Sequence, residues 1–129
     1  MGLIIKAFKN TFVFSGRLSR AEYRHLVFWL IALSIIMDIF LFLTIEKPGT
    51  ANLISTILFI LIALPLISAS IRRLHDTGKR GWLVLLNLIP FFGNMWFLLL
   101  AIRDGEPGAN RYGENPITPP LGPPATGEV

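Results

Sequence analysis

The stretch Leu26–Ile45, LVFWLIALSIIMDIFLFLTI, decides the fold, because it runs for 20 residues with a single charged side chain, Asp38. Two further apolar blocks, Leu53–Ile71 and Trp82–Ile102, contain no charged residue. An α-helix rises about 1.5 Å per residue, so each block is long enough to cross roughly 30 Å of hydrocarbon. The blocks lack the alternation of a membrane strand and are about twice its length. The sequence therefore predicts an all-α membrane protein with three hydrophobic helical segments.

The composition agrees with this prediction and excludes several classes of site. The 129-residue chain is 53% hydrophobic and 16% charged, whereas a soluble domain carries about 25% charged residues. It has no cysteine, which excludes disulfides, thiolate metal sites and a cysteine nucleophile. Two histidines alone do not make a metal site, so we expect neither a metal nor a cofactor. Residues 1–116 are expected to form one multi-pass membrane domain, and the proline-rich residues 117–129 a disordered tail.

The third apolar block is interrupted near its middle. It contains Pro90 and Gly93, and a proline followed by a glycine is a turn signal. We expect one kinked span, because half-helices of about 8 and 10 residues are too short to cross a bilayer. The alternative is two half-helices that enter and leave the membrane on the same side.

The basic residues alternate between the segments that flank the blocks. Five precede the first block, Lys47 alone separates the first two, and four separate the second and third. Basic residues favour the cytoplasmic side of short loops, so we expect the N-terminus and loop 72–81 inside and loop 46–52 outside. The more acidic segment after Ile102 is expected outside, as a third span requires. Anionic lipid accounts for the net charge of +4, so we expect no nucleic-acid partner.

Two helix signals precede the first block. Residues 3–14 carry apolar side chains at every fourth position from Ile4, which predicts a short amphipathic helix in the headgroup layer. Ser19 is followed three residues later by Glu22, the spacing of a capping box. We therefore expect the first membrane helix to begin just after Ser19.

Three polar segments, each beside an apolar block, carry a family resemblance. They are Phe14–Tyr23 (FSGRLSRAEY), Arg72–Gly78 (RRLHDTG) and Gly105–Pro116 (GEPGANRYGENP). In order and spacing they resemble the bacterial inner-membrane family known as domain of unknown function 805. The resemblance extends over about residues 5–116 and departs from the family at Arg24, where an aromatic residue is common. It implies a small multi-pass protein of the bacterial cytoplasmic membrane and implies no particular activity.

The segment Arg72–Asp76 is the first candidate site. On a helix, Arg72 and Arg73 lie four and three residues before Asp76, close enough for ion pairs, and His75 belongs to the residue type whose usual pKa lies near neutral pH. One interpretation is a site for an anion such as a lipid phosphate, a nucleotide or an acidic partner segment. The other is a basic belt that contacts headgroups without specificity. The candidate residues for lipid, anion or partner binding are Arg17, Arg20, Arg72, Arg73, His75, Asp76, Asn110 and Arg111.

The glycine-rich segment 105–116 also has two interpretations. Its backbone amides suit an anionic ligand, but the segment lacks the strand, helix and Lys-Ser/Thr pair of a P-loop. The alternative is a rigid turn whose residues Asn110, Arg111 and Tyr112 dock back on the protein.

Asp38 is a second candidate, because intramembrane carboxylates are costly and often functional. If the third block spans the membrane, Asp38 and Asn94 lie at equal depth, each 12 residues from the start of its block. We expect Asp38 to be hydrogen-bonded and to hold helices together, while the alternative is a pathway for protons or cations.

These observations leave three hypotheses for function. The first is a non-enzymatic membrane component that binds anionic lipid headgroups or a partner protein through a cytoplasmic basic rim. The second is a transporter or channel subunit that uses Asp38 and must self-associate, because three helices are too few to line a pore. The third, a membrane enzyme acting on a lipid phosphate, lacks a visible nucleophile or metal set.

Overall fold

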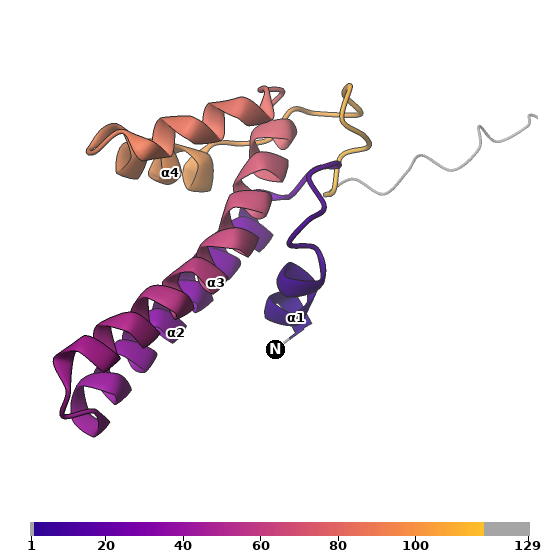
Figure 1. Ribbon diagram of the computed structural model, residues 1–129. Helices are drawn as coiled ribbons and strands as arrows, with labels where there is room; N and C mark the ends of the chain where they lie inside the picture. Colours follow the sequence, from indigo (N-terminus) through magenta and orange to yellow (C-terminus); the bar gives the residue numbers. More distant parts are fainter. Residues whose placement is uncertain (1, 118–129) are drawn as a thin grey trace, which may run out of the picture.

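The computed structural model describes residues 2–117, without the side chains of Leu3, Ile4, Ala7 and Asn94. The predicted tail therefore lies, apart from Ile117, outside the described residues. The element order is α1 (Gly2–Lys9), α2 (Arg20–Thr44), α3 (Pro48–Asp76), the 3-10 helix η1 (Gly81–Leu88) and α4 (Phe92–Ile102) (Figure 1). All of these elements are helical, as predicted.

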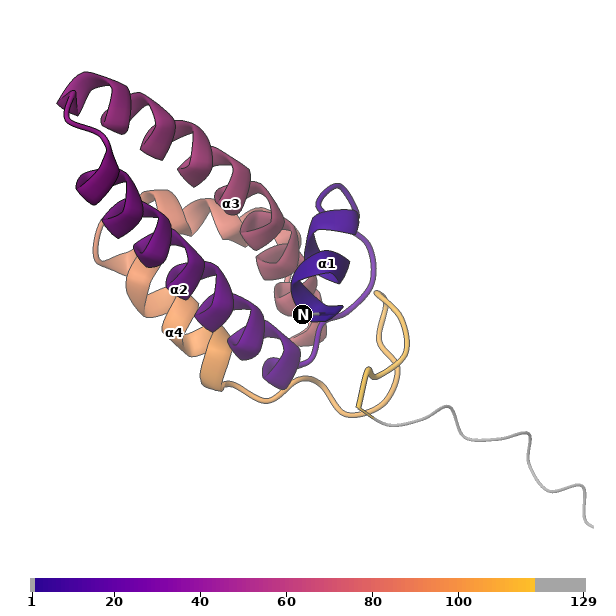
Figure 2. The same ribbon diagram turned by 90° about the horizontal axis from the view of Figure 1, so that it is seen from below.

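Helices α2 and α3 form a long antiparallel pair (Figures 1 and 2). The predicted capping box starts α2, since the Ser19 hydroxyl accepts a hydrogen bond from the Glu22 amide. Pro48 stands at the start of α3. Proline is favoured there, because the amide groups of the first helical turn have no partner within the helix. Both helices are long and apolar enough to cross a membrane, and only 17% and 22% of their most apolar windows are buried. This exposure suits a lipid environment and not the core of a soluble protein.

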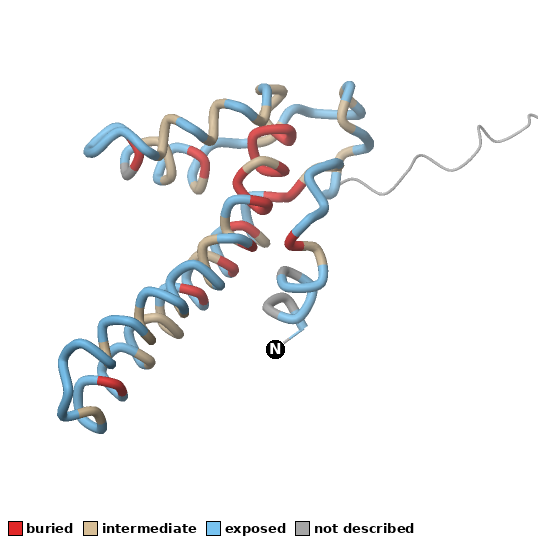
Figure 3. The backbone as a smooth tube through the Cα atoms, in the orientation of Figure 1, coloured by how far each residue is buried: buried red, intermediate tan, exposed pale blue. Residues whose placement is uncertain are grey.

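The core lies at one end of this pair. Figure 3 shows buried residues gathered where α3 ends and α2 begins, with few along the rest of the two helices. Here Tyr23 and Leu26 of α2 pack with Leu74 of α3 and Leu100 of α4. Ser68, Ala69 and Ser70 of α3 are fully buried, because small side chains allow neighbouring backbone to approach closely.

The third apolar block folds back on itself. Instead of one kinked helix, η1 and α4 form a hairpin that lies across the buried end of the α2–α3 pair (Figure 1). Pro90 has no amide to continue the helix, and Phe91 adopts a φ of +66° that reverses the chain. The expectation of a single kinked span is therefore wrong, and two short helices that fold back on each other are observed.

Gly93 lets the two arms of the hairpin meet, and its substitution tests this arrangement. A Cβ atom at this position would lie 2.6 Å from the Asn87 carbonyl oxygen. We expect Gly93→Ala to lower the free energy of unfolding in detergent by about 1–3 kcal/mol, the usual cost of overpacking. Unfolding is followed by the fluorescence of Trp82 and Trp96, which lie on the two arms.

Gly49→Ala is the matched control, because a Cβ atom there meets open space. Alanine also favours helix over glycine, so we expect this variant to be as stable as the wild type or more so. Equal stability of the Gly93 and Gly49 variants contradicts the hairpin packing.

Candidate functional site

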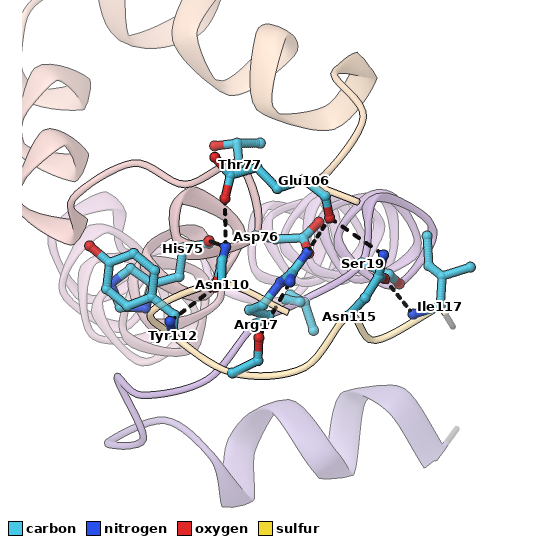
Figure 4. Close-up of polar contacts among 12 residues, drawn as sticks. Arg17, Ser19, His75, Asp76, Thr77, Glu106, Asn110, Tyr112, Asn115 and Ile117 are labelled. Atoms are coloured by element: carbon cyan, nitrogen blue, oxygen red, sulfur yellow. Dashed lines mark hydrogen bonds and ion pairs between the residues drawn. The ribbon is translucent and has the colours of Figure 1, made fainter. Parts of the chain in front are cut away.

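The three polar segments of the family resemblance meet at the end of α3 (Figure 4). At their centre, the Asp76 carboxylate is held between two guanidinium groups. Arg17 Nε donates to Asp76 Oδ1 at 2.9 Å, and Arg73 Nη1 pairs with Asp76 Oδ2. The three side chains are at most 2% exposed. We call Arg17, Arg73 and Asp76 the ion cluster.

The remaining donors of both arginines bind backbone carbonyl groups. Arg17 donates to the carbonyl oxygens of Glu106 at 2.7 Å and Gly108 at 2.6 Å. Arg73 donates to Leu100 at 2.8 Å, to Leu18 at 3.3 Å and to Arg103. The five donors of a guanidinium suit this role. Through these bonds the ion cluster ties the start of α2, the end of α3 and the chain after α4 together.

The segment after α4 also packs on Asp76 through its backbone. The Glu106 amide donates to the Asp76 carbonyl oxygen at 2.7 Å. A Cβ atom at Gly105 would clash with the Asp76 carboxylate, so only glycine allows this approach. The segment therefore lies at the same end of the molecule as the start of α2, not at the opposite end that its acidic charge favoured.

His75 is locked by neighbours from the same three segments. Its ring stacks on Tyr112 with ring centres 3.8 Å apart, and its Nδ1 lies 3.2 Å from the Gly16 carbonyl oxygen. Asn110 donates to the His75 carbonyl oxygen at 2.9 Å, and Arg111 donates to that of Gly78 at 3.2 Å. The glycine-rich segment thus docks back on the protein, and its polar side chains serve the fold.

The candidate residues therefore divide into two groups. Arg17, Arg73, His75, Asp76, Asn110 and Arg111 come together and hydrogen-bond within the protein. Arg20 lies beside them and pairs with Asp104 near the surface. Arg72 is buried, and its expected ion pair with Asp76 is not formed, because Asp76 pairs with Arg17 and Arg73 instead. The sequence reasoning missed Glu106, whose carboxylate accepts from Asn110 at 3.0 Å. A glutamate among surface turns gives no signal of such a role.

Other cations at this end face outward. Arg24, Arg80 and Arg103 are exposed, and Lys79 is partly exposed with its ammonium 6.0 Å from the centre of the Trp96 ring. None of the four forms an ion pair within residues 2–117. Their charge is therefore available to a ligand outside the protein.

Asp38 lies in a groove between α2 and α3 that is separate from the ion cluster. Ser55 donates to its carboxylate at 2.6 Å, so the pair links the two helices. The groove has a volume of about 410 Å³ and is also lined by Ser34 and Thr56. The expected partner Asn94 lies in α4, but its side chain is outside the described part, so the predicted contact stays a prediction.

The polar groups at this end of the molecule are largely used in contacts within the protein. Among the described residues, no group of three or more histidines, cysteines or carboxylates is placed to hold a metal ion. The ion cluster has its charged atoms turned toward protein partners. This geometry suits a structural role for the cluster.

Comparisons with known proteins give consistent matches. The family described as "Protein of unknown function (DUF805)" matches residues 11–114. Inner membrane protein YhaH of Escherichia coli K12 is 35% identical over 126 residues, covering 93% of this chain and 100% of the relative. Inner membrane protein YhaI of the same strain is 36% identical over 118 residues, covering 87% and 92%. No solved structure matches the chain.

One substitution tests the structural role of the ion cluster. Asp76→Asn removes the carboxylate between two buried guanidinium groups, which leaves their charge uncompensated. We expect a loss of about 3–5 kcal/mol in the free energy of unfolding in detergent. Asp104→Asn is the control, because Asp104 pairs with Arg20 at the surface, where their side chains are 78% and 45% exposed, respectively. Exposed ion pairs contribute at most about 1 kcal/mol to the free energy of unfolding. Similar losses in both variants contradict the role given to Asp76.

Proposed function

This chain belongs to the DUF805 family, and we propose that it is a non-enzymatic, multi-pass protein of the bacterial inner membrane that binds anionic lipid. In this proposal α2 and α3 cross the bilayer. The N-terminus, the ion cluster and residues 103–116 lie on the cytoplasmic side, and the turn before α3 lies outside. We call Arg24, Lys79, Arg80 and Arg103 the outward cations, and they bind anionic headgroups.

Three observations support the membrane part of the proposal. The matching proteins of E. coli are named as inner membrane proteins. The two long helices have mean hydropathy of 2.7 and 2.4 in their most apolar windows. Basic residues gather at the end that carries the ion cluster, whereas Lys47 alone stands at the opposite turn, and basic loops favour the cytoplasm.

The single observation that carries lipid binding is the set of outward cations, which find no acidic partner within residues 2–117. Each basic residue near an anionic membrane surface contributes about 1 kcal/mol of attraction. Arg17 and Arg73 do not belong to this set, since their donors are used inside the protein.

The orientation is tested by labelling cysteine variants of a chain that has no cysteine of its own. Ala109→Cys places an exposed thiol in the segment after α4, and Thr50→Cys places one near the start of α3. We expect a membrane-impermeant maleimide to label Thr50→Cys in intact cells. Ala109→Cys should react only after permeabilisation. Labelling of Ala109→Cys in intact cells overturns the proposed orientation.

Lipid binding is tested in detergent micelles with phosphatidylglycerol and phosphatidylcholine that carry brominated acyl chains, which quench tryptophan fluorescence. We expect the wild type to prefer phosphatidylglycerol and to lose the preference at high salt, because salt screens exposed charges. Replacing all four outward cations by glutamine should weaken the preference, whereas the control Lys47→Gln should leave it unchanged. A wild type without any preference refutes lipid binding and favours a partner protein at the outward cations.

A second candidate function is transport by an oligomer through Asp38. The observation that favours it is the exposed carboxylate in the groove of about 410 Å³ between α2 and α3, since intramembrane carboxylates mark proton and ion pathways. Proteoliposomes with a pH-sensitive dye inside test it under an imposed proton gradient. We expect flux in the wild type and none in Asp38→Asn, and Glu46→Gln, outside the groove, is the control. Absence of flux in the wild type refutes this candidate.

A further inference from the structure

The base of the hairpin holds a recess beside two of the outward cations. It is lined by Thr77, Lys79, Trp96, Leu99, Leu100 and Arg103. Lys79 precedes η1 and Arg103 follows α4. The hairpin therefore brings the two residues to one recess although they are 24 residues apart in the chain. Two cations on one recess attract an anion.

The nearby carboxylates do not neutralise these cations. Asp104, next to Arg103 in the chain, pairs with Arg20 on the neighbouring helix. Glu106 accepts a hydrogen bond from Asn110 on the glycine-rich segment. The Thr77 hydroxyl donates to the Leu74 carbonyl oxygen at 2.9 Å and is likewise engaged. The recess therefore keeps a net positive charge among the described residues.

An apolar cavity adjoins the recess on the side of the hairpin turn. It has a volume of about 380 Å³ and is lined by Leu86, Ile89, Phe92 and Trp96. Trp96 also lines the recess, so one side chain borders both spaces. The volume lies within the range of about 300–1,000 Å³ that is usual for ligand sites.

The two spaces match the two parts of a phospholipid, because a positively charged recess lies next to an apolar cavity. The charged recess is lined by residues 77–79 just after α3 and 96–103 of the second arm, whereas the apolar cavity is lined by Leu86, Ile89 and Phe92 near the turn of the hairpin. Tryptophan is favoured where an apolar region meets a polar one. The Lys79 ammonium over the Trp96 ring fits this boundary, because cations are attracted to the faces of aromatic rings.

We infer that the η1–α4 hairpin is a binding site for one anionic phospholipid, with an acyl chain in the cavity beyond Trp96. The recess has a volume of only about 20 Å³, so the phosphate lies at its mouth, beside Lys79 and Arg103. This inference rests on the proposed function and gives the lipid a defined place. The two cations favour a headgroup with a net negative charge over a zwitterionic one, and the cavity favours a lipid over free phosphate.

The site is tested by quenching of Trp96 alone. Trp29→Phe and Trp82→Phe together leave Trp96 as the single tryptophan of the chain. In detergent micelles, brominated phosphatidylglycerol should quench Trp96 to saturation at lower concentration than brominated phosphatidylcholine. Lys79→Gln with Arg103→Gln should raise the half-saturating concentration about 10- to 30-fold, as expected from roughly 1 kcal/mol per cation.

Two matched variants distinguish this site from general attraction to the outward cations. Arg24→Gln with Arg80→Gln removes the same charge outside the recess and should change the half-saturating concentration less than threefold. Arg103→Gln alone keeps the fold, because the ion cluster uses the carbonyl group of Arg103 and not its side chain. It should still weaken binding several-fold.

Each outcome decides the inference. Equal effects of the two double variants overturn the specific site and leave the proposed lipid binding intact. Absence of any preference for phosphatidylglycerol overturns both. Displacement of the brominated lipid by millimolar inorganic phosphate overturns the lipid site, because the recess then recognises phosphate without the acyl chain.

Discussion

The Asp76 carboxylate between Arg17 and Arg73 is the interaction on which the rest of the structure depends. Burying three charged groups is costly unless each finds opposite charge and hydrogen-bond partners. Here the remaining N–H groups of the two arginines donate hydrogen bonds to carbonyl groups of Leu18, Leu100 and the 103–108 segment. Those carbonyl groups lie outside or at the ends of helices, where they need partners. The cluster therefore compensates for its own burial by satisfying the backbone around it.

The two ends of the molecule are stabilised differently as a result. The end with the ion cluster holds the hydrophobic core cluster and is covered by α1, the hairpin and the 103–117 segment (Figure 3). The other end consists of α2 and α3 alone, linked by the hydrogen bond from Ser55 to Asp38. Its large apolar side chains are exposed, with Phe42 at 83% and Phe59 at 69%. In our proposal lipid covers this end. Contacts within the protein then stabilise one end of the molecule, and contacts with the bilayer stabilise the other.

Local patterns in the sequence predicted the local features of the structure. The capping box at Ser19 and the Arg73–Asp76 pair involve residues three apart, and both are confirmed. The sequence predicts the hairpin only as the alternative to a kinked span, because Pro90 and Gly93 allow either a kink or a reversal. What decides is the positive φ at Phe91 and the close approach of Gly93 to Asn87. Such contacts cannot be read from hydrophobic periodicity.

The candidate site shows the same limit more sharply. A charge pattern identifies basic residues but not their partners, and Arg17 binds carbonyl groups 89 and 91 residues away. The segments that carry the family resemblance are those that assemble around Asp76. Their contacts around Asp76 suit a structural role for these segments. In our proposal the functional contacts come from the outward cations at this end of the molecule, which form no ion pair within residues 2–117 and lie beside an apolar hairpin.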